Sequence, residues 1–276
     1  MIGRERELAA ADDFLEGLAE DAAALVLEGE PGIGKTTLWA ATIARAEQRG
    51  FRVLSCRPTE AEANLSYAAL ADLLSPLEEN AFRFLPGPQR RAIDAALLRT
   101  DPLGERVDQL AVSAAVASLL TARAGERPGV LVAIDDLNWL DSSSARVLAY
   151  AVRRFDSSPV GLLVSVRNDG RRADPLALDR ALPRVRRVSL GSLSLGALRQ
   201  VLSARLGFSP SRPFLLRIHR HSGGNPFFAL ELAEMLAGEE ASLIGEAPPL
   251  PERLKALVAT RIERLPRRTR RALLLV

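Results

Sequence analysis

The sequence has one cysteine, few lysines and no long uncharged apolar run. Cys56 has no second cysteine to pair with, so an internal disulfide is impossible, as suits the reducing cytoplasm. No stretch approaches the roughly 18 apolar residues typical of a membrane-spanning helix. The N-terminus reads MIGRERE, with acids where a signal peptide would have an apolar segment. These absences predict a cytoplasmic protein without membrane contact.

Lysine is nearly absent, because only Lys35 and Lys255 among the 37 basic residues are lysines and the other 35 are arginines. The net charge is only +3. Arginine stays protonated, so it raises the isoelectric point without creating a strong field. In segment 252–276, eight basic residues oppose only two acids. A solvated helix face is favoured there over a nucleic-acid patch.

Short apolar runs alternate with helical patterns up to Leu190. This alternation predicts an α/β fold with a parallel sheet and helices on both faces. Strands are predicted at Ala22–Glu28, Phe51–Ser55, Val130–Ile134, Val160–Val166 and Arg186–Leu190. Helices are predicted at Lys35–Gln48, at 142–155 behind the capping residues Asp141–Ser143, and within 60–124 between breaks near Pro76, Pro86–Pro88 and Pro102.

After Leu190 only helical patterns remain. They predict helices at Ser194–Leu206, 212–221, Pro226–Leu236 and Glu252–Leu265, with a linker at Gly245–Pro251. We therefore expect a core over residues 1–190, a smaller helical domain over 191–245 and the start of a further helical domain over 246–276. The chain ends inside the apolar run Leu273–Val276, which carries no helix stop signal. This favours part of a longer protein; a buried C-terminal helix is the alternative.

The segment Gly29–Thr36 reads GEPGIGKT and matches the P-loop pattern G-x-x-x-x-G-K-[ST] in full. It follows a predicted strand and opens a predicted helix. Backbone N–H groups of such a loop, and the positive end of the helix dipole, bind phosphate. Lys35 is expected to reach the β- and γ-phosphates, and Thr36 to ligate Mg²⁺. The predicted nucleotide-binding residues here are Gly29, Pro31, Gly32, Ile33, Gly34, Lys35, Thr36 and Thr37.

Two acids follow the apolar strand Val130–Ile134. Asp135 is expected to hold the Mg²⁺ shell through water, and Asp136 to polarise an attacking water. The alternative is an ordinary Asp-Asp turn or helix cap. Arg167 ends the next predicted strand, at the sheet edge where ligands bind, so it is a candidate sensor of the γ-phosphate. With 35 arginines in the chain, a plain surface arginine is the alternative.

Other nucleotide and metal chemistries find less support. Guanine recognition uses an Asn-Lys-x-Asp motif, and the only lysine outside the P-loop, Lys255, lies in RLKA. Adenine is therefore favoured, and ATP is the predicted ligand. A helical second domain and paired acids on a separate strand fit a small-molecule kinase poorly. His219 and His221 have no cysteine or acid at metal-ligand spacing, so both are interpreted as structural.

Four motifs in this order resemble those of the STAND class of signalling ATPases. They are GRERE at Gly3–Glu7, the P-loop, DDLNWLD at Asp135–Asp141 and GNP at Gly224–Pro226. The chain is most similar to the ATPase module of LuxR-type large ATP-binding transcriptional regulators of bacteria. The resemblance covers nearly all 276 residues. One departure is Asn138, which stands where histidine is common.

The resemblance implies further features. Arg4 would lie near the nucleotide, and Pro226 would contact its base or sugar from a helical lid at 191–245. The sheet would have the order 5-1-4-3-2. The chain would be a regulatory switch with slow Mg²⁺-dependent ATP hydrolysis and nucleotide-dependent self-association. No helix-turn-helix follows, so DNA binding would belong to a C-terminal domain beyond residue 276. The alternatives are an AAA-type ATPase acting on DNA or protein, and a non-hydrolysing ATP-binding module.

Overall fold

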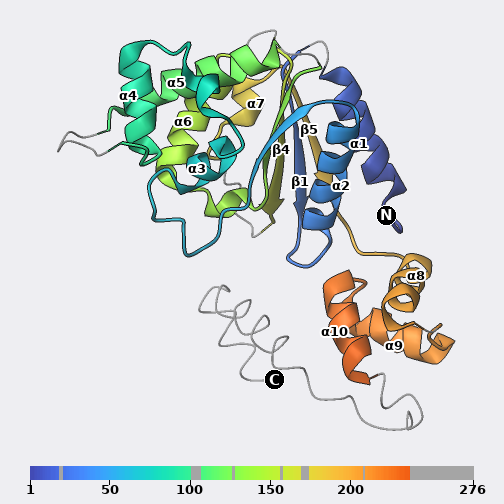
Figure 1. The fold of residues 1–276 in the computed structure, drawn as a ribbon. Helices are drawn as coiled ribbons and strands as arrows, with labels where there is room; N and C mark the ends of the chain where they lie inside the picture. Colours follow the sequence, from blue (N-terminus) through green and yellow to red (C-terminus); the bar gives the residue numbers. More distant parts are fainter. Residues whose placement is uncertain are drawn as a thin grey trace. The chain divides into compact units, whose positions relative to one another are not determined.

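The computed structural model describes residues 1–18, 21–100, 107–125, 128–155, 158–168, 174–207 and 209–236. Its contacts divide the chain into two units, with the break between Leu190 and Gly191. Figure 1 shows the elements of both units along the chain. The predicted linker Gly245–Pro251, the predicted helix Glu252–Leu265 and the whole of 246–276 lie outside the described residues.

The first unit contains five strands and the helices between them. The strands are β1 (Ala23–Gly29), β2 (Arg52–Cys56), β3 (Val130–Ile134), β4 (Val160–Arg167) and β5 (Arg184–Ser189). The α-helices are α1 (Glu5–Gly17), α2 (Lys35–Gln48), α3 (Ala68–Leu74), α4 (Gly87–Ala96), α5 (Gln109–Ala124), α6 (Ser142–Val152) and α7 (Leu178–Ala181). Two short 3₁₀ turns complete the unit: η1 (Glu79–Phe82) and η2 (Leu137–Trp139).

The sheet is parallel throughout, with the strand order β2-β3-β4-β1-β5. Read from the other edge this is 5-1-4-3-2, so the predicted order is confirmed. The registers align the carboxyl ends of the strands: Cys56 pairs with Ile134, Ile134 with Val164, and Gly29 with Arg167. The residues that follow these strands therefore meet at one edge of the sheet.

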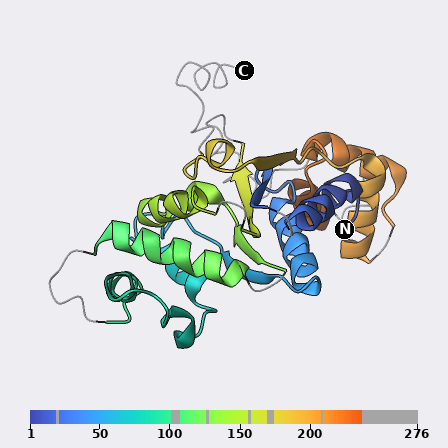
Figure 2. The same cartoon turned by 90° about the horizontal axis from the view of Figure 1, so that it is seen from above.

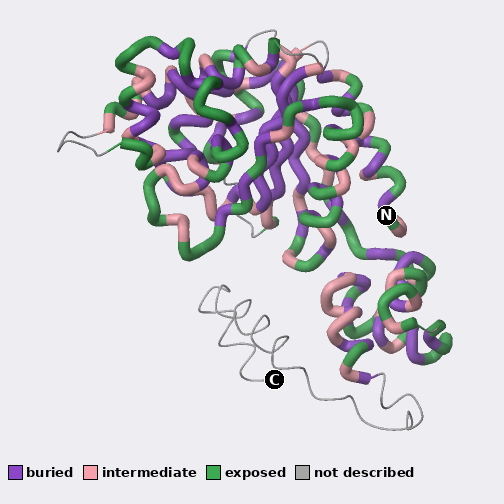
Figure 3. The backbone as a smooth tube through the Cα atoms, viewed as in Figure 1, coloured by how far each residue is buried: buried purple, intermediate pink, exposed green. Residues whose placement is uncertain are grey.

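Helices cover both faces of the sheet, and Figure 2 shows these layers from above. On one face, Leu70, Val116 and Leu148 of α3, α5 and α6 join one core with inward residues of the strands. On the other, Phe14 of α1 and Leu38 of α2 join a second core with the alternate strand residues. The central strands are buried on both faces (Figure 3), which explains their continuous apolar sequences.

Asp141 joins two helix starts within the larger core. Its carboxylate accepts hydrogen bonds from the backbone N–H groups of Ser143 and Ser144 at the start of α6, at 3.1 and 2.9 Å. It also accepts from the N–H groups of Tyr67 and Ala69 at the start of α3, at 3.0 and 3.2 Å. The predicted capping segment therefore fixes α3 as well as α6.

We expect Asp141→Ala to lower the free energy of unfolding by about 2–4 kcal/mol, because it leaves three buried donors and one part-buried donor without an acceptor. Urea denaturation measures this change. Asp108→Ala is the matched control, since the Asp108 carboxylate caps only α5, at an exposed position, and accepts from two N–H groups. The free energy of unfolding of the Asp108→Ala control should fall by about 1 kcal/mol. Equal losses in the two variants would contradict the double role of Asp141.

The second unit contains α8 (Leu195–Leu206), α9 (Arg212–Ser222) and α10 (Pro226–Leu236). Leu198, Leu202, Phe214, Ile218 and Ala233 form its core. The bounds of α10 agree with those predicted, and α8 and α9 differ from theirs by one residue at one end. No helix among the described residues is long and apolar enough to cross a membrane.

Candidate active site

The P-loop is a tight backbone turn that leads into α2. Gly32 and Gly34 have φ angles of +78° and +104°, which glycine adopts at little cost. A Cβ at Gly29 would lie 2.9 Å from the Ile33 side chain, so this glycine allows the loop to close on itself. Ile33 is buried in the second core and anchors the loop. The glycines thus allow the tight turn between β1 and α2, and phosphate binding by this loop stays a prediction.

Lys35 lies across the P-loop with its side chain only 8% exposed. Its Nζ donates to the carbonyl oxygens of Gly29 and Glu30, at 2.9 and 3.0 Å. Burial lowers the pKa of Lys35 below its usual range, and the carboxylates of Asp136 and Asp135 act in the opposite direction. A buried ammonium gains strongly from an anionic ligand. Thr36 and Thr37 are exposed in the first turn of α2.

The side chain of Arg4 contacts the backbone of the P-loop. Its Nη2 donates to the carbonyl of Ile33 at 2.9 Å, and its Nη1 forms an ion pair with Glu7 at 3.0 Å. The side chain is buried. The structure therefore places Arg4 against the loop itself, and direct contact with the nucleotide stays a prediction.

Asp135 lies at the carboxyl edge of the sheet and is nearly buried. Its Oδ1 accepts a hydrogen bond from the hydroxyl of Ser165 on β4 at 2.6 Å. The same hydroxyl accepts from the N–H of Asp136 at 2.8 Å. Oδ2 lies 3.3 Å from Nη2 of Arg57, which follows β2. Ser165 thus holds the carboxylate of Asp135 and the backbone of Asp136 from the neighbouring strand.

Asp136 and Arg167 form an ion pair. Nε of Arg167 lies 3.0 and 2.9 Å from the two carboxylate oxygens of Asp136, and Nη2 donates to Oδ2 as well. The guanidinium also lies 5.6 Å from the ring centroid of Trp139. Asn138 accepts a hydrogen bond from the backbone N–H of Arg167 at 2.9 Å. Asp136 adopts a left-handed backbone conformation, with φ of +66°. Of the three predicted catalytic residues, Lys35, Asp136 and Arg167, the last two therefore contact each other.

A family model described as AAA ATPase domain matches residues 1–165, more than half of the chain. The chain belongs to the AAA ATPase domain family. This membership fits the P-loop, the paired acids and the parallel sheet described above. A search of curated proteins found no match.

Several solved AAA-type structures are similar in fold. Cdc6p from Pyrobaculum aerophilum has a TM-score of 0.54 at 14% identity, over 86% of this chain and 62% of that one. Orc1 from Aeropyrum pernix in complex with DNA has a TM-score of 0.52 at 17% identity, over 97% and 69%. AMPPCP-bound DnaA from Aquifex aeolicus has a TM-score of 0.51 at 14% identity, over 87% and 64%. Such identities support the fold alone.

The donor set of this AAA ATPase domain fits Mg²⁺ bound together with a nucleotide. Among the described residues, no group of three or more His, Cys, Asp or Glu side chains could hold a metal. Mg²⁺ commonly takes only one or two protein ligands and completes its shell with phosphate oxygens and water. The Thr36 hydroxyl and the Asp135 carboxylate are the side chains that would hold it. When bound, the ion would neutralise charge on the phosphates.

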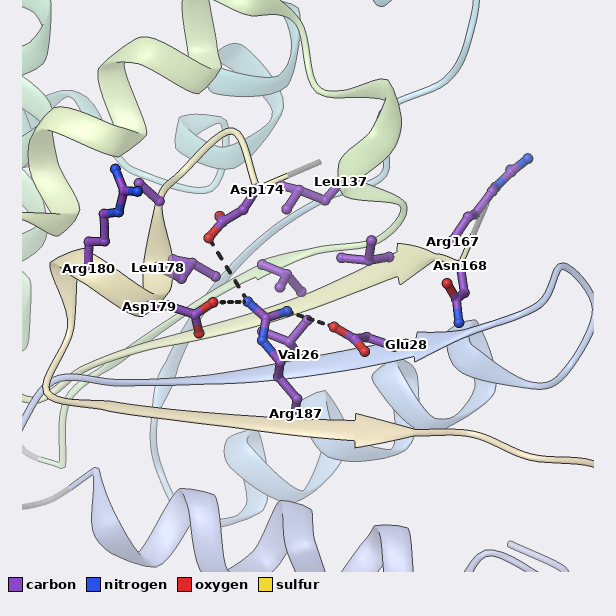
Figure 4. Close-up of a pocket in the computed structure, with 13 residues that line it drawn as sticks. Val26, Glu28, Leu137, Arg167, Asn168, Asp174, Leu178, Asp179, Arg180 and Arg187 are labelled. Atoms are coloured by element: carbon purple, nitrogen blue, oxygen red, sulfur yellow. Dashed lines mark hydrogen bonds and ion pairs between the residues drawn. The ribbon is translucent and has the colours of Figure 1, made fainter. Parts of the chain in front are cut away.

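A hollow of about 770 Å³ lies on the sheet face opposite α2 (Figure 4). Arg187 of β5 lies at its centre, 2.6 Å from the Glu28 carboxylate and 2.7 Å from that of Asp179. The hydrogen bond with Asp179 raises the pKa of Arg187. Three acids and three arginines line the hollow, so their charges balance. Among the described residues that line this hollow, Arg167 is the only predicted site residue. We therefore interpret Arg187 and its carboxylate partners as a structural cluster.

Pro226 begins α10 in the second unit. The chain turns there through Gly223 and Gly224, which have φ angles of +60° and +74°. The side chain of Asn225 accepts from the N–H of Phe227 at 3.1 Å. These contacts form a helix end followed by a helix start, and the contact of Pro226 with nucleotide stays a prediction. His219 lies 3.3 Å from the carbonyl oxygen of Leu193, in agreement with a structural role.

Sequence reasoning missed three residues at this edge: Arg57, Ser165 and the supporting Asn138. Arg57 and Ser165 share one signal, since each lies at the end of a strand in a parallel sheet. Such positions face the ligand crevice in α/β proteins. A systematic inspection of strand ends would have found both residues, whereas the side-chain role of Asn138 depends on the fold.

Proposed function

We propose that this AAA ATPase domain is an ATP-binding regulatory switch of the STAND class, within a bacterial transcriptional regulator. The observation that carries the proposal is geometric. Gly29 at the start of the P-loop pairs with Arg167 on the neighbouring strand, and Arg167 contacts Asp136, so the P-loop, the arginine and the acids meet at one edge of the sheet. Such a site can bind a triphosphate, hold Mg²⁺ and polarise water.

The Asp136–Arg167 ion pair supports slow, gated hydrolysis. A carboxylate that is held by a guanidinium on both oxygens is a poor acceptor for a proton from water. Asp136 must therefore turn away from Arg167 before it can act as a base. We propose that Arg167 leaves Asp136 for the γ-phosphate when ATP binds, which links hydrolysis to the presence of the triphosphate.

The domain assignment is part of the proposal. Residues 1–190 form the ATPase core, 191–245 form a helical lid, and 246–276 begin a further helical domain. In a switch of this kind the ATP-bound and ADP-bound states differ in how the lid is held. Self-association would then depend on the nucleotide.

We expect Pro226→Ala to weaken ADP and ATP binding by about 1 kcal/mol, if Pro226 makes an apolar contact with the nucleotide. Isothermal titration calorimetry measures the affinity. Proline also favours the first turn of a helix, so both interpretations predict some loss of stability. Pro213→Ala is the matched control, because Pro213 occupies the first turn of α9. Equal nucleotide affinities in wild type and Pro226→Ala would show that Pro226 serves only to start helix α10.

Turnover of ATP by the purified chain tests the proposal. We expect slow Mg²⁺-dependent release of phosphate from ATP and little from GTP. Binding of ATP without any release would favour the non-hydrolysing module. An AAA-type ATPase acting on DNA is the second candidate, favoured by the similar fold of Orc1 solved in complex with DNA. Strong stimulation of turnover by double-stranded DNA would support that candidate instead.

A further inference from the structure

Arg57 is an arginine at the active-site edge to which the proposed function gives no role. It is the first residue after β2, and β2 pairs with β3 so that Cys56 lies beside Ile134. The next residues along the two strands, Arg57 and Asp135, therefore lie side by side. Asp135 is the expected carboxylate of the Mg²⁺ shell. A permanent positive charge thus lies beside the expected metal ligand.

The contacts place the guanidinium of Arg57 between β3 and α2. Its Nη2 lies 3.3 Å from Oδ2 of Asp135, and its Cζ lies 5.6 Å from the ring centroid of Trp39. Trp39 follows Thr36, the expected hydroxyl ligand of Mg²⁺, by one turn of the same helix. Arg57 is therefore directed toward the region between the two residues that would hold the ion.

The two partners differ strongly in exposure. The side chain of Arg57 is 63% exposed, whereas that of Asp135 is 8% exposed. A nearly buried carboxylate needs a counter-charge, because burial disfavours its ionised form. The exposed guanidinium supplies that charge and can move away without leaving water. Since Oδ1 of Asp135 already accepts from Ser165, Oδ2 is the oxygen left for a cation or its bound water.

We propose that Arg57 acts as a built-in substitute for Mg²⁺ at Asp135. It balances the carboxylate while the metal is absent and leaves it when the hydrated ion binds. Arg57 is thus a positioning residue that sets how strongly nucleotide affinity depends on Mg²⁺. The inference rests on the proposed ATP site, and it adds a residue that controls coupling between metal and nucleotide.

The expected effect of losing Arg57 on nucleotide affinity differs with and without metal. Without Mg²⁺, an unbalanced Asp135 would repel the phosphates, so loss of Arg57 should weaken nucleotide binding. With saturating Mg²⁺, the ion balances Asp135, so loss of Arg57 should leave affinity unchanged or raise it. A simple phosphate contact by Arg57 would weaken binding in both conditions. A purely structural ion pair would change neither affinity.

The test is calorimetric binding of the nonhydrolysable analogue AMPPCP to wild type and Arg57→Gln, with EDTA and with saturating Mg²⁺. We expect the metal-free affinity of Arg57→Gln to fall about threefold to fivefold, the range of an ion pair with one exposed partner. The Mg²⁺-induced gain in affinity should rise by the same factor. Arg57→Lys keeps the charge and should recover part of the metal-free affinity.

Arg52→Gln is the matched control. Arg52 is an exposed arginine at the start of the same strand, roughly 16 Å from Arg57 along β2. The Arg52→Gln variant loses the same positive charge as Arg57→Gln, and it should bind AMPPCP as tightly as wild type does in both conditions. Equal Mg²⁺-induced gains in wild type and Arg57→Gln would overturn the inference while leaving the ATP site in place. Failure of wild type to bind AMPPCP in either condition would overturn the proposed function itself.

Discussion

Replacing Lys35 with alanine is expected to abolish nucleotide binding and leave the fold intact. The Nζ group of Lys35 is buried against the P-loop carbonyls of Gly29 and Glu30, where a phosphate would be its natural counter-charge. At a hundredfold excess over the dissociation constant, ATP should stabilise the wild type by about 2.7 kcal/mol. A thermal shift assay should detect this stabilisation in wild type and none in Lys35→Ala.

The control for this experiment is Arg45→Ala. Arg45 lies in the last turn of the same helix α2 and pairs with Asp12 on α1, so it loses a charge away from the P-loop. Its thermal shift with ATP should equal that of wild type. Circular dichroism should show the same helix content in all three proteins. An undiminished shift in Lys35→Ala would contradict the P-loop assignment.

Replacing Asp136 with asparagine is expected to slow ATP hydrolysis by about a hundredfold while Mg·ATP still binds. The change keeps the shape of the side chain and removes the charge that would accept a proton from water, and the loss is at the lower end for a positioned base. Single-turnover measurement of phosphate release separates this step from binding. It avoids the uncertainty of a slow product release.

Asp179→Asn is the matched control for Asp136→Asn, because Asp179 also forms an ion pair with an arginine, Arg187, and has no predicted part in hydrolysis. It should hydrolyse ATP at the wild-type rate. Arg167→Ala is a second variant to compare with Asp136→Asn, since it frees the Asp136 carboxylate but removes the proposed γ-phosphate sensor. Unchanged turnover in Asp136→Asn would show that another group activates the water.

The strands that pack on both faces were the easiest elements to predict. Val130–Ile134 is an uninterrupted apolar run between Gly129 and Asp135, and the structure gives β3 the predicted bounds. β5 begins two residues earlier than predicted, at Arg184. It is an edge strand of the described sheet, and three of its six residues are arginines, which blur the apolar pattern. Helix α1 was not predicted, although Leu8, Phe14 and Leu15 mark its buried face.

Only the part of the site that lies in one continuous segment could be predicted from the sequence. The P-loop depends on one continuous segment whose spacing carries the chemistry, so its residues followed from the motif. The Asp136–Arg167 pair depends on the alignment of β3 with β4, which no local pattern contains. Arg57 lies just after a predicted strand, but the partner of its side chain depends on the same kind of alignment. Among 35 arginines, only the register of β2 against β3 brings that one to Asp135.

The most direct test of the switch is hydrogen exchange of the chain saturated with Mg·AMPPCP and, separately, with Mg·ADP. Saturation of both samples removes differences in occupancy. A ligand can shift a conformational equilibrium only through its different affinities for the two states. If the γ-phosphate releases Arg167 from Asp136 and changes how the lid is held, backbone amides of residues 194–236 should exchange more slowly with the triphosphate analogue than with ADP. Identical exchange rates of these residues with the two nucleotides would contradict the proposed switch. The chain would then bind nucleotide without changing state.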